Sequence, residues 1–194
     1  MIKKLLLLIC LSSSVFLTAQ EENTQASVEK NQWGVTIGLV EAKLQNEIKL
    51  ARKATLRLEA GVDLFSYEYL SFESSRLKEK TGFLFAPTIT AEPMFYYNID
   101  RRKNLEKNTN RNSGNYFSLR TLYGFTESEL YNSNNNIELS NTFVIAPKYG
   151  IKRAFGKNFF YEFGFGLGWI QTKVNSKTES NLYVDISTRI GINF

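Results

Sequence analysis

The chain has 194 residues, with 24 Lys and Arg against 19 Asp and Glu, and it is rich in aromatic residues (15 Phe, 10 Tyr and 2 Trp). This length suffices for a single domain, and the weak basic excess gives no reason to expect a nucleic-acid partner. Beyond the N-terminus no apolar run reaches the roughly 20 residues that a spanning helix requires, which excludes a helical membrane protein.

The first 19 residues have the three parts of an export signal. Lys3 and Lys4 form a basic start, residues 5–17 are apolar except for a short serine run, and Ala19 is a small residue before a cut. We therefore predict a cleavable signal peptide at the start of the chain, cleaved between Ala19 and Gln20. The alternative is an uncleaved membrane anchor, which the shortness of the apolar stretch disfavours.

Cysteine occurs only in this predicted signal peptide. Cys10 is the single cysteine, and Ile9 before it is larger than the small residue that a lipoprotein signal requires. The mature chain is thus predicted to contain no disulfide and no Cys-ligated metal. Residues 20–31 are polar and without periodicity, so they are predicted to form a loose leader before one domain at residues 32–194.

From Trp33 onward apolar residues recur at every second position, which is the pattern of strands with two different faces. The apolar positions are odd-numbered over residues 33–40 and even-numbered over 42–50. Because a shift by one residue moves every side chain to the other face, we predict two short strands with a tight turn near Glu41. Six further strands are predicted at residues 56–64, 83–97, 117–125, 143–152, 159–170 and 182–194.

Eight antiparallel strands place both termini at one end, as in bacterial outer-membrane barrels. The fold class predicted is all-β: an eight-stranded antiparallel up-and-down transmembrane β-barrel, preceded by the cleavable signal peptide. At the end that holds the termini, turns are predicted at residues 51–53, 98–114 and 156–158. At the other end, polar loops are predicted at residues 67–82, 127–139 and 173–181.

Alternation alone does not separate a membrane barrel from a soluble binding barrel with its apolar face inward. Lipid on the apolar face is favoured by aromatic residues near the strand ends and by glycines on the polar face, which suit a crowded eight-stranded interior. It is also favoured by charges of both signs on the polar face, because an interior can pair them. The residues predicted to form this interior charge network are Arg57, Glu59, Asp63, Glu92, Arg120, Lys148, Glu162, Asp185 and Arg189.

All three prolines, Pro87, Pro93 and Pro147, fall inside predicted strands. Proline has no backbone N–H and therefore removes a hydrogen bond from the ladder of a sheet. We predict β-bulges or locally broken pairing at these positions.

Several short segments carry a resemblance to a known layout: Trp-Gly-Val at 33–35, Glu-Pro-Met-Phe-Tyr-Tyr-Asn at 92–98, Asn-Ser-Gly-Asn at 112–115, Pro-Lys-Tyr-Gly at 147–150 and the final six residues. In these the chain resembles small outer-membrane barrels of the OmpA transmembrane-domain and OmpX type, and most closely a family of uncharacterised envelope proteins. The terminal Phe194 resembles the signal read by the barrel assembly machinery. The resemblance implies a barrel in the bacterial outer membrane, surrounded by its lipid, and it carries no catalytic residue.

The chain contains no histidine, so a serine nucleophile would lack its usual base. Glu59 and Asp63 could in principle act as acid and base, but they lie among arginines and are predicted to be structural. We predict no catalytic residue, no cofactor and no metal.

The sequence predicts a monomeric, non-enzymatic protein that acts structurally or through its loops, with a possible periplasmic or surface partner. The candidate contacts are the basic turn at residues 100–111 and the Asn-rich loop at 132–136. Two alternatives stay open: a narrow channel or transporter for small or apolar solutes, and a lipid-modifying enzyme that uses carboxylates alone.

Overall fold

The computed structural model of the chain describes residues 25–73, 76–134, 139–174 and 177–194. The predicted signal peptide and its cleavage site lie outside these ranges. Short helical segments are α2 (Ile99–Asn104), η2 (Asn110–Asn112) and η3 (Thr126–Ser128). The strands are β1 Asn31–Gly38, β2 Glu41–Ala51, β3 Ala54–Glu73, β4 Arg76–Phe95, β5 Gly114–Gly124, β6 Tyr131–Asn132, β7 Leu139–Phe155, β8 Phe159–Val174 and β9 Lys177–Asn193.

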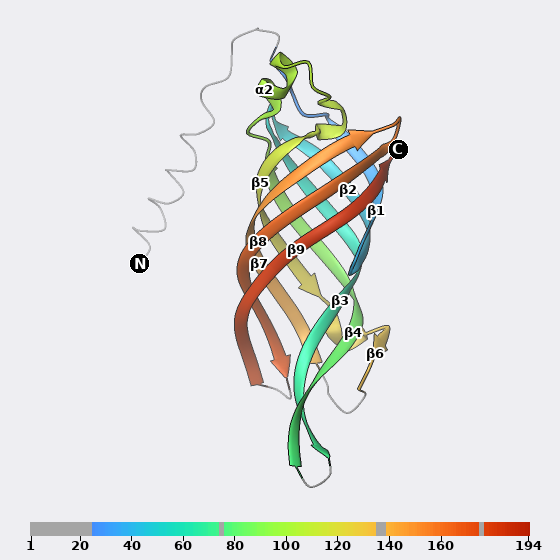
Figure 1. Ribbon diagram of the computed structural model, residues 1–194, viewed down its shortest axis with the longest axis vertical. Coiled ribbons are helices and arrows are strands. Elements are labelled where there is room, and N and C mark those ends of the chain that lie inside the picture. The colour runs from blue at the N-terminus through green and yellow to red at the C-terminus, as the bar shows by residue number, and fades with distance from the viewer. Residues whose placement is uncertain (1–24, 74–75, 135–138, 175–176) are drawn as a thin grey trace, which may run out of the picture.

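Eight of these strands form an antiparallel sheet that closes into a ring (Figure 1). Each strand pairs with the next, and β9 returns to pair with β1 from Gly34↔Asn193 to Gly38↔Arg189. The two-residue β6 adds to the outer part of β4. The prediction of an antiparallel ring of eight strands is confirmed. We call the end where β1 begins and β9 finishes the terminal end, and the opposite end, where β3 and β4 project, the hairpin end.

The alternation in the sequence becomes an alternation between the outside and the inside of the ring. On β8, Phe163 and Phe165 are 49% and 52% exposed, whereas Phe160 and Glu162, which point to the other face, have no exposed surface. On β9, Ile190 is 58% exposed and Arg189 is buried. Because successive side chains of a strand point to opposite faces, the apolar face is outside and the charged face is inside. A soluble barrel with an apolar interior has the reverse arrangement.

The prediction of loops at residues 67–82 and 173–181 is wrong. β3 and β4 pair without interruption as far as Glu73↔Arg76, and β8 and β9 pair as far as Val174↔Lys177. Residues 178–182 are all exposed, on both faces of β9. A strand that meets water on both faces needs no apolar alternation, so its composition is that of a loop.

Strand pairing is interrupted beside two of the three prolines. β4 and β5 lose their pairing at Pro93, and β7 and β8 lose theirs at Pro147, while the register continues unchanged on either side. Pro87 lies just beyond the last pair of β4 with β5, Thr88↔Gly124. Broken pairing is therefore confirmed at Pro93 and Pro147. The predicted bulges are absent there, and the register shifts lie elsewhere in β2 and β7.

The leader predicted to be loose is packed over residues 25–30. Ala26 and Val28 are buried in a cluster with inward-facing residues of the terminal end. The Val28 N–H donates to the Arg52 carbonyl at 2.9 Å, and the Glu29 N–H donates to Asn112 Oδ1 at 2.8 Å. The segment therefore covers the terminal end of the ring. Two apolar residues are too few for a periodicity to be recognised, which is why the sequence concealed this packing.

Candidate functional site: the charged interior and its cavity

Glu162 lies at the centre of the charged interior. Its carboxylate accepts two hydrogen bonds from the Arg57 guanidinium, at 2.9 and 2.8 Å, and one from Arg189 Nη2 at 2.7 Å. The Tyr116 hydroxyl donates a further bond at 2.7 Å. All four side chains are buried. Charge-assisted bonds of this kind offset the cost of taking the ions out of water.

Further carboxylates balance the two arginines from other strands. Glu59 pairs with Arg189 at 2.7 Å, and Glu47 and Glu92 each lie 3.6 Å from Arg57. Glu47 also binds Lys152 at 2.7 Å. Glu47 and Glu92 reach Arg57 from the two neighbouring strands, but other pairs join strands that are not neighbours in the ring, such as β3 with β8 through Arg57–Glu162 and β2 with β7 through Glu47–Lys152. Charged side chains therefore cross the interior rather than lining its wall.

A second layer of ions lies nearer the hairpin end. Arg120 bonds Asp185 at 3.0 Å and Glu41 at 3.1 Å, and Lys43 pairs with Asp63 at 2.9 Å. Its side chains are buried, like those around Glu162.

The structure brings all nine residues of the predicted network together inside the ring, including Lys148, which lies 3.7 Å from Asp185. Four further residues belong to the same network and were not in the predicted set: Glu41, Lys43, Glu47 and Lys152. Glu41 was assigned to a turn but is the first residue of β2. The odd-numbered polar face of β2 would have indicated both Glu41 and Lys43.

A cavity of about 620 Å³ lies between the second layer and the hairpin end, where it opens. Glu41, Asp63, Arg120 and Asp185 line its floor, and its walls come mainly from β3, β5, β7 and β9. The cavity therefore has a charged floor and walls formed by the strands of the sheet.

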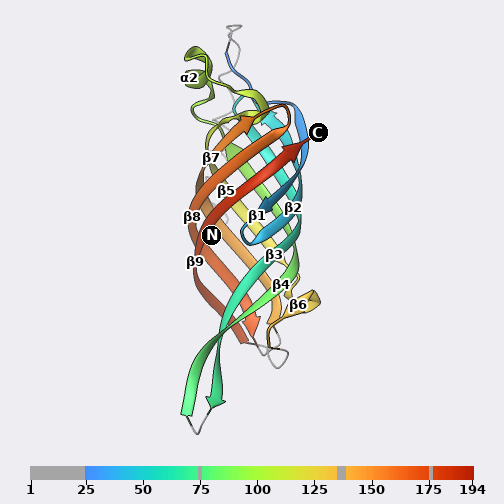
Figure 2. The same cartoon turned by 45° about the vertical axis from the view of Figure 1, so that its right-hand side comes forward.

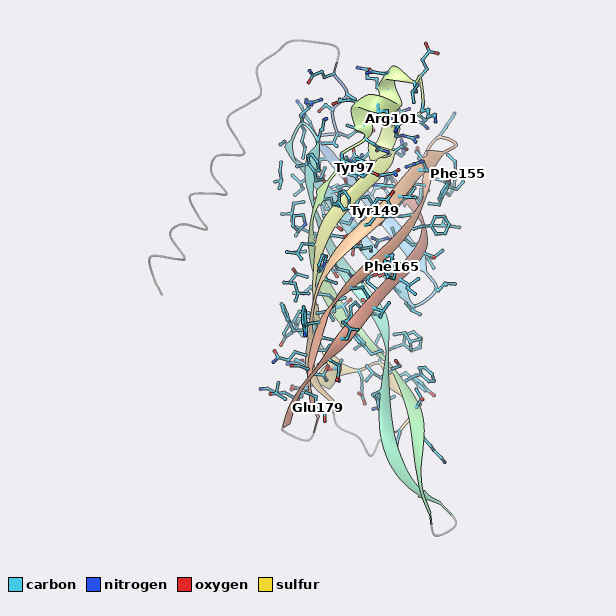
Figure 3. The ribbon with its side chains drawn as sticks, turned by 60° about the vertical axis from the view of Figure 1, so that its left-hand side comes forward. Tyr97, Arg101, Tyr149, Phe155, Phe165 and Glu179 are labelled. Atoms are coloured by element: carbon cyan, nitrogen blue, oxygen red, sulfur yellow. The ribbon has the colours of Figure 1, made fainter. Side chains whose placement is uncertain are left out.

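The basic turn at residues 100–111 forms α2 and η2 at the terminal end. Arg101 and Lys103 are exposed, and Figure 3 shows Arg101 beyond the ends of the strands. Asp100 anchors this turn, because its carboxylate accepts a hydrogen bond from Arg52 Nη1 at 2.7 Å and pairs with Lys53 Nζ at 2.5 Å.

Replacing Asp100 with Asn is expected to loosen α2. Burial raises the pKa of Asp100, but the hydrogen bonds from Arg52 and Lys53 outweigh it and hold that pKa below the ordinary 3.8. A carboxyl group with a depressed folded pKa stabilises above its unfolded pKa and loses this effect as the pH falls through the folded value. Hydrogen exchange of the α2 amides should therefore be faster in the variant at neutral pH, and the difference should vanish in strong acid.

The exposed Glu106→Gln, in the same turn, is the matched control and should leave exchange unchanged. Equal protection of α2 in Asp100→Asn and the unchanged protein at neutral pH would contradict the anchoring role.

Among the described residues no group of His, Cys, Asp and Glu side chains is arranged to hold a metal ion. The helices in the described ranges are all too short or too polar to cross a membrane. Compared with models of protein families and with curated protein sequences, the chain gives no match. Its resemblance to small outer-membrane barrels thus stays a prediction from the sequence.

Proposed function

We propose that the protein is an integral β-barrel of a bacterial outer membrane, exported by its signal peptide, and that it is neither an enzyme nor an open pore. The observation that carries this proposal is the inverted distribution of side chains. Most outward residues of β8 and β9 are large and apolar and are between 37% and 71% exposed, for example Phe165 at 52% and Ile186 at 69%. Monomeric soluble proteins rarely expose apolar patches beyond a few hundred Å², whereas lipid removes that cost.

The size of the outer apolar band supports the same proposal. Phe159 and Trp169 lie ten residues apart on β8 and face outward. At about 3.3 Å per residue and a tilt of about 40°, they span about 25 Å, which is the height of the apolar band of outer-membrane barrels.

Aromatic rings gather at the edge of this band. At the terminal end Phe117 packs against Tyr97 and Tyr149, with ring centroids 5.3 and 5.5 Å apart (Figure 3). The Tyr149 hydroxyl accepts a hydrogen bond from Asn115 at 2.7 Å. Rings with one polar end suit the boundary between lipid and water.

The contents of the ring argue against an open pore. An eight-stranded barrel has an interior that side chains just fill, and here ion pairs such as Arg57–Glu162 cross it. We therefore propose a structural or interaction role, exerted through the projecting β3–β4 hairpin and the other surfaces outside the membrane. A surface or periplasmic partner would bind there, and the barrel itself would act as a monomer. Phe194, which is exposed directly after the last strand, would serve as the signal to the assembly machinery.

Cell fractionation combined with gel mobility tests the location. The protein is expected in the outer-membrane fraction, and its unboiled form should migrate faster than its boiled form because a folded barrel resists the detergent. Recovery in the soluble periplasm, with no change of mobility on boiling, would overturn the proposal.

Conductance tests the absence of a pore. Purified protein added to a planar lipid bilayer is expected to give no stable open current. A steady current would instead support the narrow-channel alternative and remove the structural role proposed for the filled interior.

A further inference from the structure

Within the described residues, the wall of the ring is interrupted beside the turn between β1 and β2. The β1–β2 hairpin turns between Gly38 and Glu41, partway along the ring (Figure 2). Beyond that turn, toward the hairpin end, the described residues of β9 pair only with β8 and those of β3 pair only with β4. Two strands are missing from the wall there, which at about 4.8 Å per spacing leaves a gap of about 14 Å. We call this gap, between β3 and β9 on the hairpin-end side of the β1–β2 turn, the notch.

The cavity at the hairpin end extends through the notch. Consecutive residues 182–188 of β9 line it, inward-facing and outward-facing alike, and so do residues 64–67 of β3 and the turn residues Leu39 and Val40. On an intact wall only every second residue of a strand could face an interior cavity. The cavity therefore passes around the edge of β9 to the outside of the ring.

The notch opens at the height of the outer apolar band. The outward residues Leu182, Val184 and Ile186 along its edge are 71%, 48% and 69% exposed, and Leu182 pairs with Trp169 at the rim of that band. A sheet edge exposes backbone N–H and C=O groups, which lipid tails cannot satisfy. Such an edge is tolerated in a membrane only where it borders a cavity that supplies polar partners.

The floor of the cavity offers hydrogen-bond acceptors. Its charged groups are three carboxylates and one guanidinium, that of Arg120. Lys43 and Lys148, which pair with these carboxylates, lie deeper in the ring and do not line the cavity. Ser187 Oγ is buried without a hydrogen-bond partner in the described part of the chain, and Glu41 Oε1 accepts no hydrogen bond there, although Arg189 Nη1 lies 3.5 Å from it. Both residues line the cavity and are less than a tenth exposed. Buried polar atoms of this kind are normally satisfied, so they indicate a bound group that donates hydrogen bonds.

We propose that the notch and cavity bind a single-chain amphiphile from the outer leaflet of the membrane, with its uncharged or cationic donor head on the floor and its chain passing outward through the notch. The proposal rests on the membrane location proposed above. Acceptors on the floor disfavour a carboxylate head, and the apolar edge of β9 suits an alkyl chain. A volume of 620 Å³ is large enough for such a molecule and lies within the range of small-molecule sites.

The test uses the full mature protein in phosphatidylcholine nanodiscs that contain dodecylamine or, separately, dodecanoic acid, with bound molecules counted by native mass spectrometry. One dodecylamine is expected to stay bound, with an occupancy about tenfold above that of dodecanoic acid, a factor that corresponds to about 1.4 kcal/mol. Equal retention of the two, or retention of neither by protein that is folded in the nanodisc, would overturn the proposal while leaving the membrane location intact. Failure to insert would contradict the membrane location itself.

A variant that obstructs the notch distinguishes binding in the notch from binding elsewhere on the surface. Ser66 is exposed at the free edge of β3 and lines the cavity, so Ser66→Trp should fold normally and reduce dodecylamine retention about tenfold. Ser180→Trp, an exposed residue of β9 outside the lining, is the matched control and should retain the amine. Unchanged retention in folded Ser66→Trp would exclude the notch as the binding site.

Discussion

Glu162→Gln is expected to lower the free energy of unfolding by about 3–5 kcal/mol, the usual cost of removing one partner from a buried ion pair. Glu162 takes hydrogen bonds from both Arg57 and Arg189 in a place that water does not reach. Glutamine keeps the shape but removes the charge. Arg57 then remains buried with only Glu47 and Glu92, each 3.6 Å away, to balance it, and Arg189 keeps Glu59 as its one close carboxylate among the described residues.

The measurement is urea unfolding of the protein folded in detergent micelles, followed by gel mobility and by circular dichroism. Glu179→Gln is the matched control, because Glu179 is exposed near the hairpin end and forms no ion pair within the described part of the chain (Figure 3). Its effect should stay within about 0.5 kcal/mol. A loss in Glu162→Gln no larger than that of the control would show that the network contributes nothing to stability.

A double-mutant cycle assigns the loss to the pair. Arg57→Gln alone should also be destabilising, because it leaves Glu162 with a single guanidinium. The double variant Arg57→Gln with Glu162→Gln should lose less than the sum of the single variants, because neither charge is then left without its partner. Additive losses would mean that the two residues act independently, against the direct contacts of 2.8 and 2.9 Å.

The faces of the strands could be predicted because a two-residue period leaves little ambiguity. Along β8 every outward position from Phe159 to Trp169 is apolar, and the structure exposes these residues. The short first hairpin followed from the same rule, through the change of parity near Glu41. The partners inside the ring could not be predicted, because they depend on how far the strands are staggered. Arg57 and Glu162 lie 105 residues apart on strands that do not pair.

The hairpin end marks the limit of the pattern. Residues 67–82 were predicted to be a loop because their composition is polar, yet β3 and β4 continue through them as a paired ladder. Backbone hydrogen bonds hold such a hairpin whatever its side chains, so alternation disappears while the strand persists. The cavity was equally hidden, since it results from β1 and β2 ending before their neighbours.

Phe165→Arg is expected to destabilise the protein folded in a phosphatidylcholine bilayer by about 2–4 kcal/mol, the cost of arginine at the midplane on the lipid face of a barrel. Phe165 points outward from β8 and lies between the two ends of the molecule (Figure 3). Phe155 also points outward and is 45% exposed, but it lies at the terminal end, so Phe155→Arg should cost only about 0–1 kcal/mol.

The contrast between these two positions distinguishes lipid from water as the surroundings of the outer face. In water, arginine at either exposed position would have a similar and small effect, because neither side chain would leave its solvent. In a bilayer the cost depends on depth, since the charge at residue 165 must reach the interface while the charge at residue 155 is already there. Unfolding by urea in vesicles measures both, and equal small changes would show that the apolar outer face does not lie in a membrane.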